Sequence, residues 1–206
     1  MSHIIYLASQ SPSRKRLLQE TAIPFQVLTQ FADEKACDWT LPLEQLVKSI
    51  AIYKMDSLLI NEIQPQSTGL VWVLTADTLG QDAQGKIYAK PADYDDAVNQ
   101  IKKQRDQWVR VATAFCLDRK VFKDGSWQIE ERFSQTVISH IFFSIEDHEI
   151  DRYINVVDAL SCAGSISIDG FGGQYLKALD GSYSSVIGLP LFEVRQALKK
   201  TNFFDN

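Results

Sequence analysis

Hydrophobic positions recur along this chain with two spacings, one typical of strands and the other of helices. Compact apolar runs predict strands, and the run at 70–74 is apolar throughout, as in a strand buried on both faces of a sheet. Apolar residues spaced by three or four positions predict amphipathic helices. Short strands are expected at 3–8, 25–28, 70–74, 86–89 and about 174–179, and helices at 12–20, from 40–42 past 54, from 91–93 to about 101, from 144–147 through 153, and from about 190.

The middle of the chain predicts a long β-hairpin. Two strand-like runs, 107–121 and 127–143, are joined by a turn at 123–125 that contains Asp-Gly. Ser144 begins a predicted capping box ahead of the fourth helix. Strands that alternate with helices, together with a hairpin, indicate an α/β fold with a mixed sheet.

Composition and charge narrow the class of protein. No repeat or linker interrupts the 206 residues, so we expect residues 1–206 to form a single domain. The net charge of −5, with no basic block beyond 14–16, argues against nucleic acid as a partner. No apolar run of about 18 residues and no leader is present, which predicts a cytoplasmic protein without a membrane segment. The three cysteines are widely spaced, which predicts reduced thiols.

The first candidate site is the turn between the first strand and the first helix. Ser11 stands where an N-cap belongs, and Pro12 occupies the first helical position. The turn also carries the Ser9 hydroxyl and Arg14, and a helix N-terminus with such groups suits a phosphate. The alternative is a well-capped helix with a solvated basic face.

Two acidic positions are candidates for metal binding or for acid–base chemistry. Asp77 follows the apolar strand at 70–74, and ligands bind at the carboxyl ends of strands in open α/β sheets. A carboxylate there can coordinate a divalent ion or accept a proton from water, but it can also simply cap the next turn. Asp33 and Glu34 form a second acidic pair, of the kind that binds Mg²⁺ or is merely solvated.

Lysines and a glycine-rich segment complete the candidates. Lys54 interrupts the apolar face of the second helix and Lys90 follows a strand, so either could bind phosphate, although surface solvation is the commoner role. The segment 164–173 matches neither a Walker loop nor a Rossmann fingerprint. Asp169 within it could accept hydrogen bonds from a base edge, or the segment could be a plain β connection.

Taken in order, these pieces resemble the Maf family, also called the septum-formation-inhibitor family of nucleoside triphosphate pyrophosphatases. The resemblance runs through nearly the whole chain. It is carried by LASQSPSRKRLL at 7–18, the pair Asp33-Glu34, Lys54, TADT at 75–78, AKP at 89–91, AGSISIDGFG at 163–172 and GSYSSVIGLPL at 181–191.

The resemblance implies a fold, a reaction and a set of roles. The fold would be a mixed, twisted sheet with flanking helices, in two lobes around a central cleft, often in a homodimer. The reaction would hydrolyse a nucleoside triphosphate to monophosphate and pyrophosphate with Mg²⁺ or Mn²⁺. The implied catalytic residues are Asp77, Lys54 and Lys90, the implied metal ligands are Glu34 and Asp77, and the implied substrate-binding residues are Ser9, Ser11, Ser13, Arg14, Thr78 and Asp169.

Departures from the family pattern bear on the choice of base. Ser13 replaces the arginine of the thymidine/uridine-type members and the tryptophan of the 7-methylguanosine-type members. Thr78 resembles the first type, whereas 161–165 and the acidic Asp169 resemble the second, and an acid suits a cationic methylated purine. We therefore expect 7-methyl-GTP, with dTTP/UTP as the alternative.

Other departures leave two non-enzymatic alternatives. The usual Ser-Gly-x-x-His segment is not recognisable around 104–109, and Ala89 stands in place of a glycine. These changes are compatible with a non-catalytic nucleotide-binding regulator of cell division, or with a plain metabolite-binding domain. The acid at Asp77 favours the enzyme.

Overall fold

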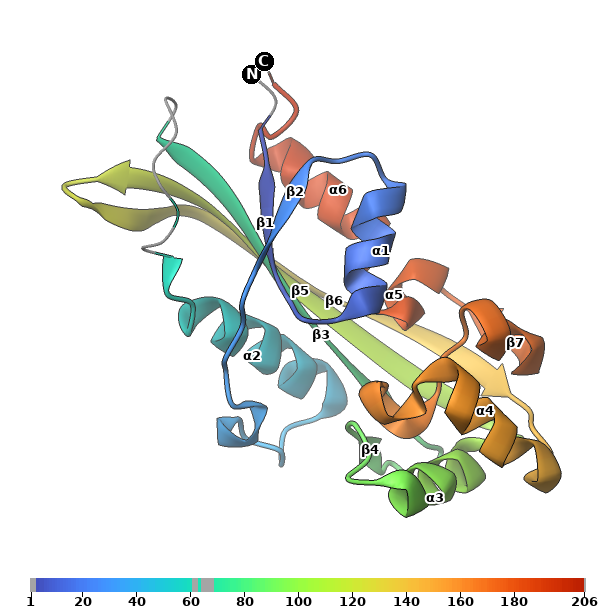
Figure 1. The fold of residues 1–206 in the computed structure, drawn as a ribbon. Helices are drawn as coiled ribbons and strands as arrows, with labels where there is room; N and C mark the ends of the chain where they lie inside the picture. The colour runs from blue at the N-terminus through green and yellow to red at the C-terminus, as the bar shows by residue number, and fades with distance from the viewer. Residues whose placement is uncertain (1–2, 61–62, 64–68, 206) are drawn as a thin grey trace. The chain divides into compact units, whose positions relative to one another are not determined.

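The computed structural model describes residues 3–60, 63 and 69–205. In this part of the chain, seven strands form one mixed sheet in the order β2-β1-β3-β5-β6-β7, with β4 paired to β3, and helices flank it (Figure 1). The elements are β1 Ile5–Ala8, α1 Pro12–Glu20, β2 Phe25–Leu28, α2 Leu43–Asp56, β3 Leu70–Gln81, β4 Ile87–Tyr88, α3 Tyr94–Gln104, β5 Trp108–Lys123, β6 Ser126–Phe143, α4 Ile150–Val157, β7 Leu176–Asp180, α5 Tyr183–Ile187 and α6 Leu191–Lys200. The predicted α/β fold with a mixed sheet is confirmed.

The chain divides into two compact units. The first contains residues up to Asp77, the stretch Ala114–Thr136, and residues from Gly188 onward. The second contains Thr78–Thr113 and Val137–Ile187. The strands β3, β5 and β6 each contribute residues to both units. The cleft that the family resemblance implies stays a prediction.

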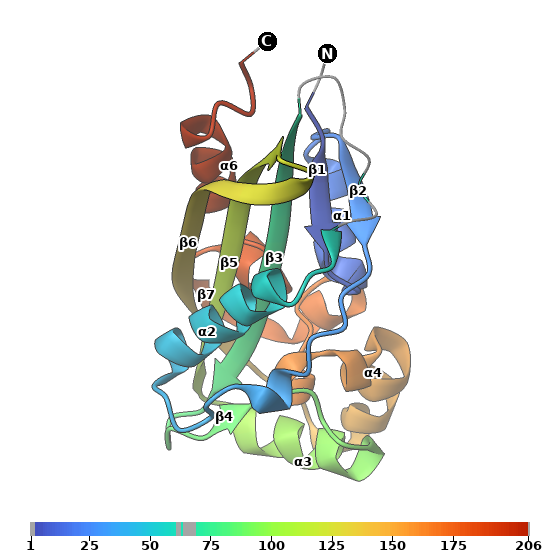
Figure 2. The same ribbon diagram turned by 90° about the vertical axis from the view of Figure 1, so that its left-hand side faces the viewer.

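In the first unit, β1 lies between β2 and β3 and is parallel to both. The helix α2 covers one face of these strands, while α1 and α6 cover the other (Figures 1 and 2). Side chains of β3 alternate between the two faces. Trp72 donates its indole N–H to Thr201 Oγ1 (2.9 Å) beyond the end of α6, whereas Thr75 donates to the Ala51 carbonyl of α2 (2.7 Å). Asp77 therefore projects from the face of β3 that α2 covers.

In the second unit, α3 and α4 pack on a core rich in aromatic rings. Phe143 and Tyr153 meet edge-on with ring centroids 5.3 Å apart, and Tyr175 packs against both. Ile101 of α3 is fully buried in the same cluster.

The predicted hairpin of β5 and β6 is confirmed, and its turn contains Gly125 at a φ of +78°.

Two local predictions are wrong. The capping box is formed by Glu146 and Glu149, because the Ser144 hydroxyl instead donates to the Asp106 carboxylate (2.6 Å). The strand that contains Asp77 does not end there but continues to Gln81, because its last residues pair with Tyr88 and Ile87 of β4. Asp77 is thus an interior residue of a long strand.

The glycine-rich segment at 164–173 leads to β7 through two short 3₁₀ helices, Ala163–Ser165 and Gly170–Tyr175, with no helix over 166–169. At Gly172 a Cβ atom would lie 2.0 Å from the Ser167 carbonyl oxygen, so only glycine fits this approach. At the neighbouring Gly173 a Cβ would lie 3.2 Å from the Ile168 carbonyl oxygen, which a small shift relieves.

The variant Gly172→Ala should lower the free energy of unfolding by about 1–3 kcal/mol, the usual cost of overpacking. Gly173→Ala is the matched control and should lower it by less, because its contact is longer. Urea denaturation of both variants measures the difference. Equal stability of the two variants would contradict the close approach at Gly172.

The cysteines agree with the sequence prediction. Cys37, Cys116 and Cys162 are free thiols, and burial raises the pKa of Cys116 to about 12. Among the described residues, no helix is both long enough and apolar enough to cross a membrane.

Candidate active site

The turn from Ser9 to Arg14 has the predicted cap. The Ser11 hydroxyl accepts from the Arg14 N–H (3.4 Å), and Pro12 is the first residue of α1. The Ser9 hydroxyl accepts from the Ser11 N–H (3.2 Å), which closes the turn. Ser13 is half-buried in the first turn of the helix.

Arg14 is buried, so the alternative of a wholly solvated basic face is wrong for this residue. Its Nε donates to the Gly188 carbonyl (2.7 Å), and its Nη1 donates to Ser9 Oγ (3.3 Å). Burial lowers the pKa of Arg14, and the charges of Asp77 and Glu34 oppose that shift. The guanidinium is therefore held in a fixed position, where it interacts electrostatically with the two carboxylates.

Lys54 joins the two acidic candidates. Its Nζ lies 2.6 Å from Asp77 Oδ1 and 2.6 Å from Glu34 Oε1. The Lys54 and Asp77 side chains are each less than a tenth exposed, whereas Glu34 is 40% exposed. The lysine that interrupts the apolar face of α2 is thus buried in an ion pair rather than solvated. One cation neutralises part of the charge of two carboxylates that differ in their access to water.

The two carboxylate oxygens of Asp77 differ in their hydrogen bonding. Oδ1 accepts from Lys54, while Oδ2 is buried and has no hydrogen-bond partner among the described residues. Burial raises the pKa of Asp77, and Lys54 and Arg14 oppose the rise. Buried polar atoms are nearly always paired, so an unpaired carboxylate oxygen points to a water or an ion as its partner.

The acidic pair at 33–34 divides into two roles. The Asp33 carboxylate accepts from the Lys35 N–H (3.1 Å) and caps a 3₁₀ helix over Glu34–Ala36, so its role is local. Glu34 contacts Lys54 and belongs to the site. In the part of the chain that the structure describes, no three His, Cys, Asp or Glu side chains form a metal cluster. Two carboxylates suit Mg²⁺ only when substrate phosphates and waters complete its shell.

The second unit places Thr78, Lys90 and Asp169. Thr78 Oγ1 lies 2.9 Å from Thr113 Oγ1, so its hydroxyl is held in place. Lys90 follows β4 and is exposed. The half-buried Asp169 accepts from the Ser167 hydroxyl (2.8 Å). Of the predicted site residues, the structure thus brings Ser9, Ser11, Arg14, Glu34, Lys54 and Asp77 together in the first unit, and it describes Thr78, Lys90 and Asp169 in the second.

Sequence reasoning missed the residues that support Lys54. The Gln30 amide donates to the Lys54 carbonyl (2.5 Å) and also accepts from the Ala32 N–H, so it ties the loop before Glu34 to α2. Thr75 fastens α2 to β3 at Ala51. A hydroxyl inside the apolar run at 70–76 was the available signal for Thr75, whereas Gln30 offered none.

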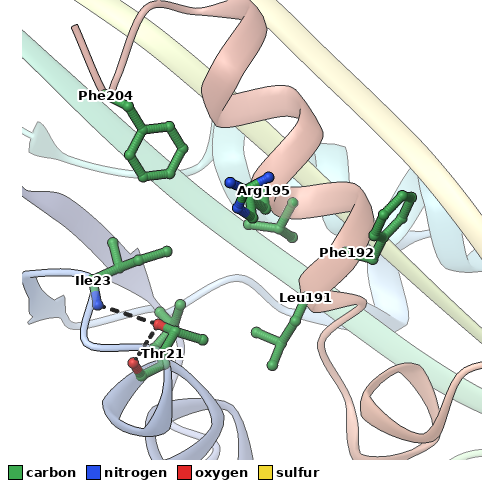
Figure 3. A pocket seen from close by; sticks show the side chains of 8 residues that line it. Thr21, Ile23, Leu191, Phe192, Arg195 and Phe204 are labelled. Atoms are coloured by element: carbon green, nitrogen blue, oxygen red, sulfur yellow. Dashed lines mark hydrogen bonds between the residues drawn. The ribbon is translucent and has the colours of Figure 1, made fainter.

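An apolar groove of about 320 Å³ in the first unit is separate from these residues (Figure 3). Its one cation, Arg195, lies over the ring of Phe204 with its guanidinium carbon 5.8 Å from the centroid. With one cation among its lining residues, the groove lacks the several cations and donors that a triphosphate requires. It is lined by Leu18, Thr21, Ile23, Leu191, Phe192, Val194, Arg195 and Phe204.

Comparison with known proteins decides the family. The family described as "Maf-like protein" matches residues 4–201. The chain belongs to the Maf family. Among curated Maf relatives, a "Nucleoside triphosphate pyrophosphatase" of Prochlorococcus marinus (strain MIT 9313) is 32% identical over 95% of this chain and 99% of its own length. A "dTTP/UTP pyrophosphatase" of Pelodictyon phaeoclathratiforme is 33% identical over 95% of this chain and 96% of its own length. A protein with the same name from Caldicellulosiruptor bescii is 31% identical over 97% of this chain and 95% of its own length.

Proposed function

We propose that this Maf-family chain is a nucleoside triphosphate pyrophosphatase, which releases a monophosphate and pyrophosphate. The observation that carries the proposal is Asp77, a buried carboxylate with one oxygen on Lys54 and the other unpaired. The relatives described above are named for the same reaction, which supports the proposal.

In the proposed reaction, a water oxygen bonds to the α-phosphorus and the bond from that phosphorus to the α–β bridging oxygen breaks. Asp77 Oδ2 accepts the proton of the attacking water, while Lys54 holds Oδ1 and so fixes the carboxylate. Arg14 and the hydroxyls of the Ser9–Arg14 turn balance charge on the phosphate oxygens. The Lys90 ammonium is the further cation that we propose for binding the phosphates of the nucleotide. Pyrophosphate leaves with the electron pair of the broken bond.

A divalent metal fits the residues present. Glu34 and the Asp77 carboxylate would hold Mg²⁺ or Mn²⁺ together with phosphate oxygens, and the ion would neutralise charge that develops on them. Addition of Mg²⁺ or Mn²⁺ should therefore be required for turnover. The homodimer and the cytoplasmic location that the family resemblance implies stay predictions.

The nucleotide base that the protein prefers is the more specific part of the proposal. Asp169 offers a half-buried carboxylate, which suits the positive charge of a 7-methylated guanine and supports 7-methyl-GTP. Thr78, and relatives named dTTP/UTP pyrophosphatases, support the alternative of dTTP and UTP. Either base requires the same chemistry at Asp77.

A panel of nucleoside triphosphates with Mg²⁺ or Mn²⁺ and detection of pyrophosphate tests the function. We expect release of pyrophosphate, not orthophosphate, with 7-methyl-GTP turned over best. Best turnover of dTTP or UTP would overturn the base preference and keep the reaction. Tight nucleotide binding with no product under either metal would overturn the enzyme and favour a non-catalytic nucleotide-binding regulator.

A further inference from the structure

A buried amide in the second unit has no part in the reaction described above. Gln104, the last residue of α3, is 1% exposed. Its Nε2 donates to the Gly164 carbonyl (2.7 Å) and to the Gln100 carbonyl (3.1 Å). Burying a primary amide is costly unless hydrogen bonds replace those to water. The Gln104 amide therefore depends on these two hydrogen bonds, which fix it to the backbone at Gly164 and Gln100.

The first segment that it holds is the turn at Gly164 and Ser165. Both residues have positive φ, +68° and +58°, so this backbone depends on outside contacts. A Cβ at position 164 would lie 2.7 Å from Gln104 Oε1, so the glycine and the amide fit each other closely. Gln100 Oε1 accepts from the Ser165 hydroxyl (3.1 Å), which adds a second bond from α3 to the same turn.

This turn also holds Ala89, the residue before Lys90. The Gly164 N–H donates to the Ala89 carbonyl (3.0 Å). Gln104 thus bonds one side of the Gly164 peptide backbone while Ala89 bonds the other. A shift of Gly164 would move the backbone from which the Lys90 side chain extends.

Gln104 also lies close to the strand that carries Thr78. A Cβ on Gly80, two residues after Thr78 in β3, would lie 3.4 Å from Gln104 Oε1. The segment that leads from the turn to Asp169 is held at its other end by Tyr153, which bonds both the N–H (2.6 Å) and the carbonyl (3.0 Å) of Ser167. The Gln104 side chain therefore bonds the turn that leads to Asp169 and lies close to the strand that carries Thr78. It is also linked through Gly164 to Ala89, the residue before Lys90.

We propose that Gln104 is a positioning residue for the nucleotide, which sets the places of Lys90 and of the chain leading to Asp169. The proposal rests on the proposed function, because those two residues have a role only if a nucleotide binds. Gln104 acts through Gly164 and does not touch the substrate. Asp77 and Lys54 make their hydrogen bonds in the first unit, so loss of Gln104 should weaken binding more than it slows the chemical step.

The test is the split between KM and kcat in Gln104→Leu, which keeps the size of the side chain and removes both hydrogen bonds. We expect KM for the best nucleotide of the wild-type protein to rise about tenfold, the equivalent of about 1.4 kcal/mol, with kcat changed by less than about threefold. Gln104→Asn is the second variant, because it keeps an amide that is too short for the same reach. It should raise KM in the same direction.

Ile101→Ala is the matched control, because Ile101 is buried on the same helix and contacts the aromatic core. It should reduce the free energy of unfolding and leave KM near the wild-type value. An unchanged KM in both Gln104 variants would overturn the proposal, as would an equal rise in Ile101→Ala. A wild-type protein that neither binds nor hydrolyses any triphosphate would instead overturn the proposed function, and the role of Gln104 would fall with it.

Discussion

Asp77→Asn should lower turnover by about 10²–10⁴-fold, the usual contribution of a general base, while the protein stays folded. The amide is the same size as the carboxylate, but it cannot take a proton from water and is a poorer partner for a metal. Lys54 would keep a neutral acceptor in Oδ1 at a weakened contact. We therefore expect kcat to fall much more than the affinity for the nucleotide.

Steady-state pyrophosphate release measures this loss, and circular dichroism with urea denaturation checks the fold. Asp82→Asn is the matched control, because Asp82 is a buried aspartate that bonds the Tyr88 hydroxyl (2.7 Å) and two backbone N–H groups of its own turn. It should affect stability and leave kcat near the wild-type value. Retention of wild-type turnover in Asp77→Asn would remove Asp77 from the mechanism.

Lys54→Met should have the largest effect on stability, a loss of about 3 kcal/mol in the free energy of unfolding, because it leaves the buried Asp77 carboxylate without its bonded cation. The pair with Glu34 adds little, since that carboxylate is 40% exposed and solvent screens it. Methionine fills a volume close to that of the lysine stem, so the loss reports charge rather than a cavity.

Urea denaturation of Lys54→Met and of Lys54→Met with Asp77→Asn separates these contributions. The double variant should be more stable than Lys54→Met alone, because the unpaired charge is gone. Lys35→Met, at an exposed lysine beside Glu34, is the control and should be close to wild type. If the double variant is no more stable than Lys54→Met, the ion pair is not the cause of the loss.

The parts of this fold that depend on neighbouring residues could be predicted from the sequence. The helix at 12–20 has the predicted bounds because Ser11 and Pro12 define its start within two residues. Arg14 was found as a candidate because helix starts are recognisable in an α/β chain, and Asp77 because it follows a conspicuous apolar run, although the strand continues beyond it. The burial of Asp77 and Arg14 and the electrostatic interaction between them could not be predicted, because both depend on residues far apart in the sequence.

The wrong predictions and the missed residues have the same cause, which is dependence on contacts with other segments of the chain. The continuation of β3 beyond Asp77 depends on pairing with β4, and a polar sequence at 77–81 gives no sign of it. Gln104 lies in a segment where the family motif is not recognisable, and its importance comes from Gly164, 60 residues away in sequence. Glycines at 164 and 172 were visible, but the close approaches that require them were not.

The route of the chain through its two units limits how the protein can be divided. The chain changes unit four times, at 77/78, 113/114, 136/137 and 187/188. Neither unit is therefore a continuous stretch, and a cut at 113/114 or at 136/137 divides both units between the two fragments. Expression of separate halves should yield no folded lobe, whereas two complementary fragments mixed together have the residues to rebuild both.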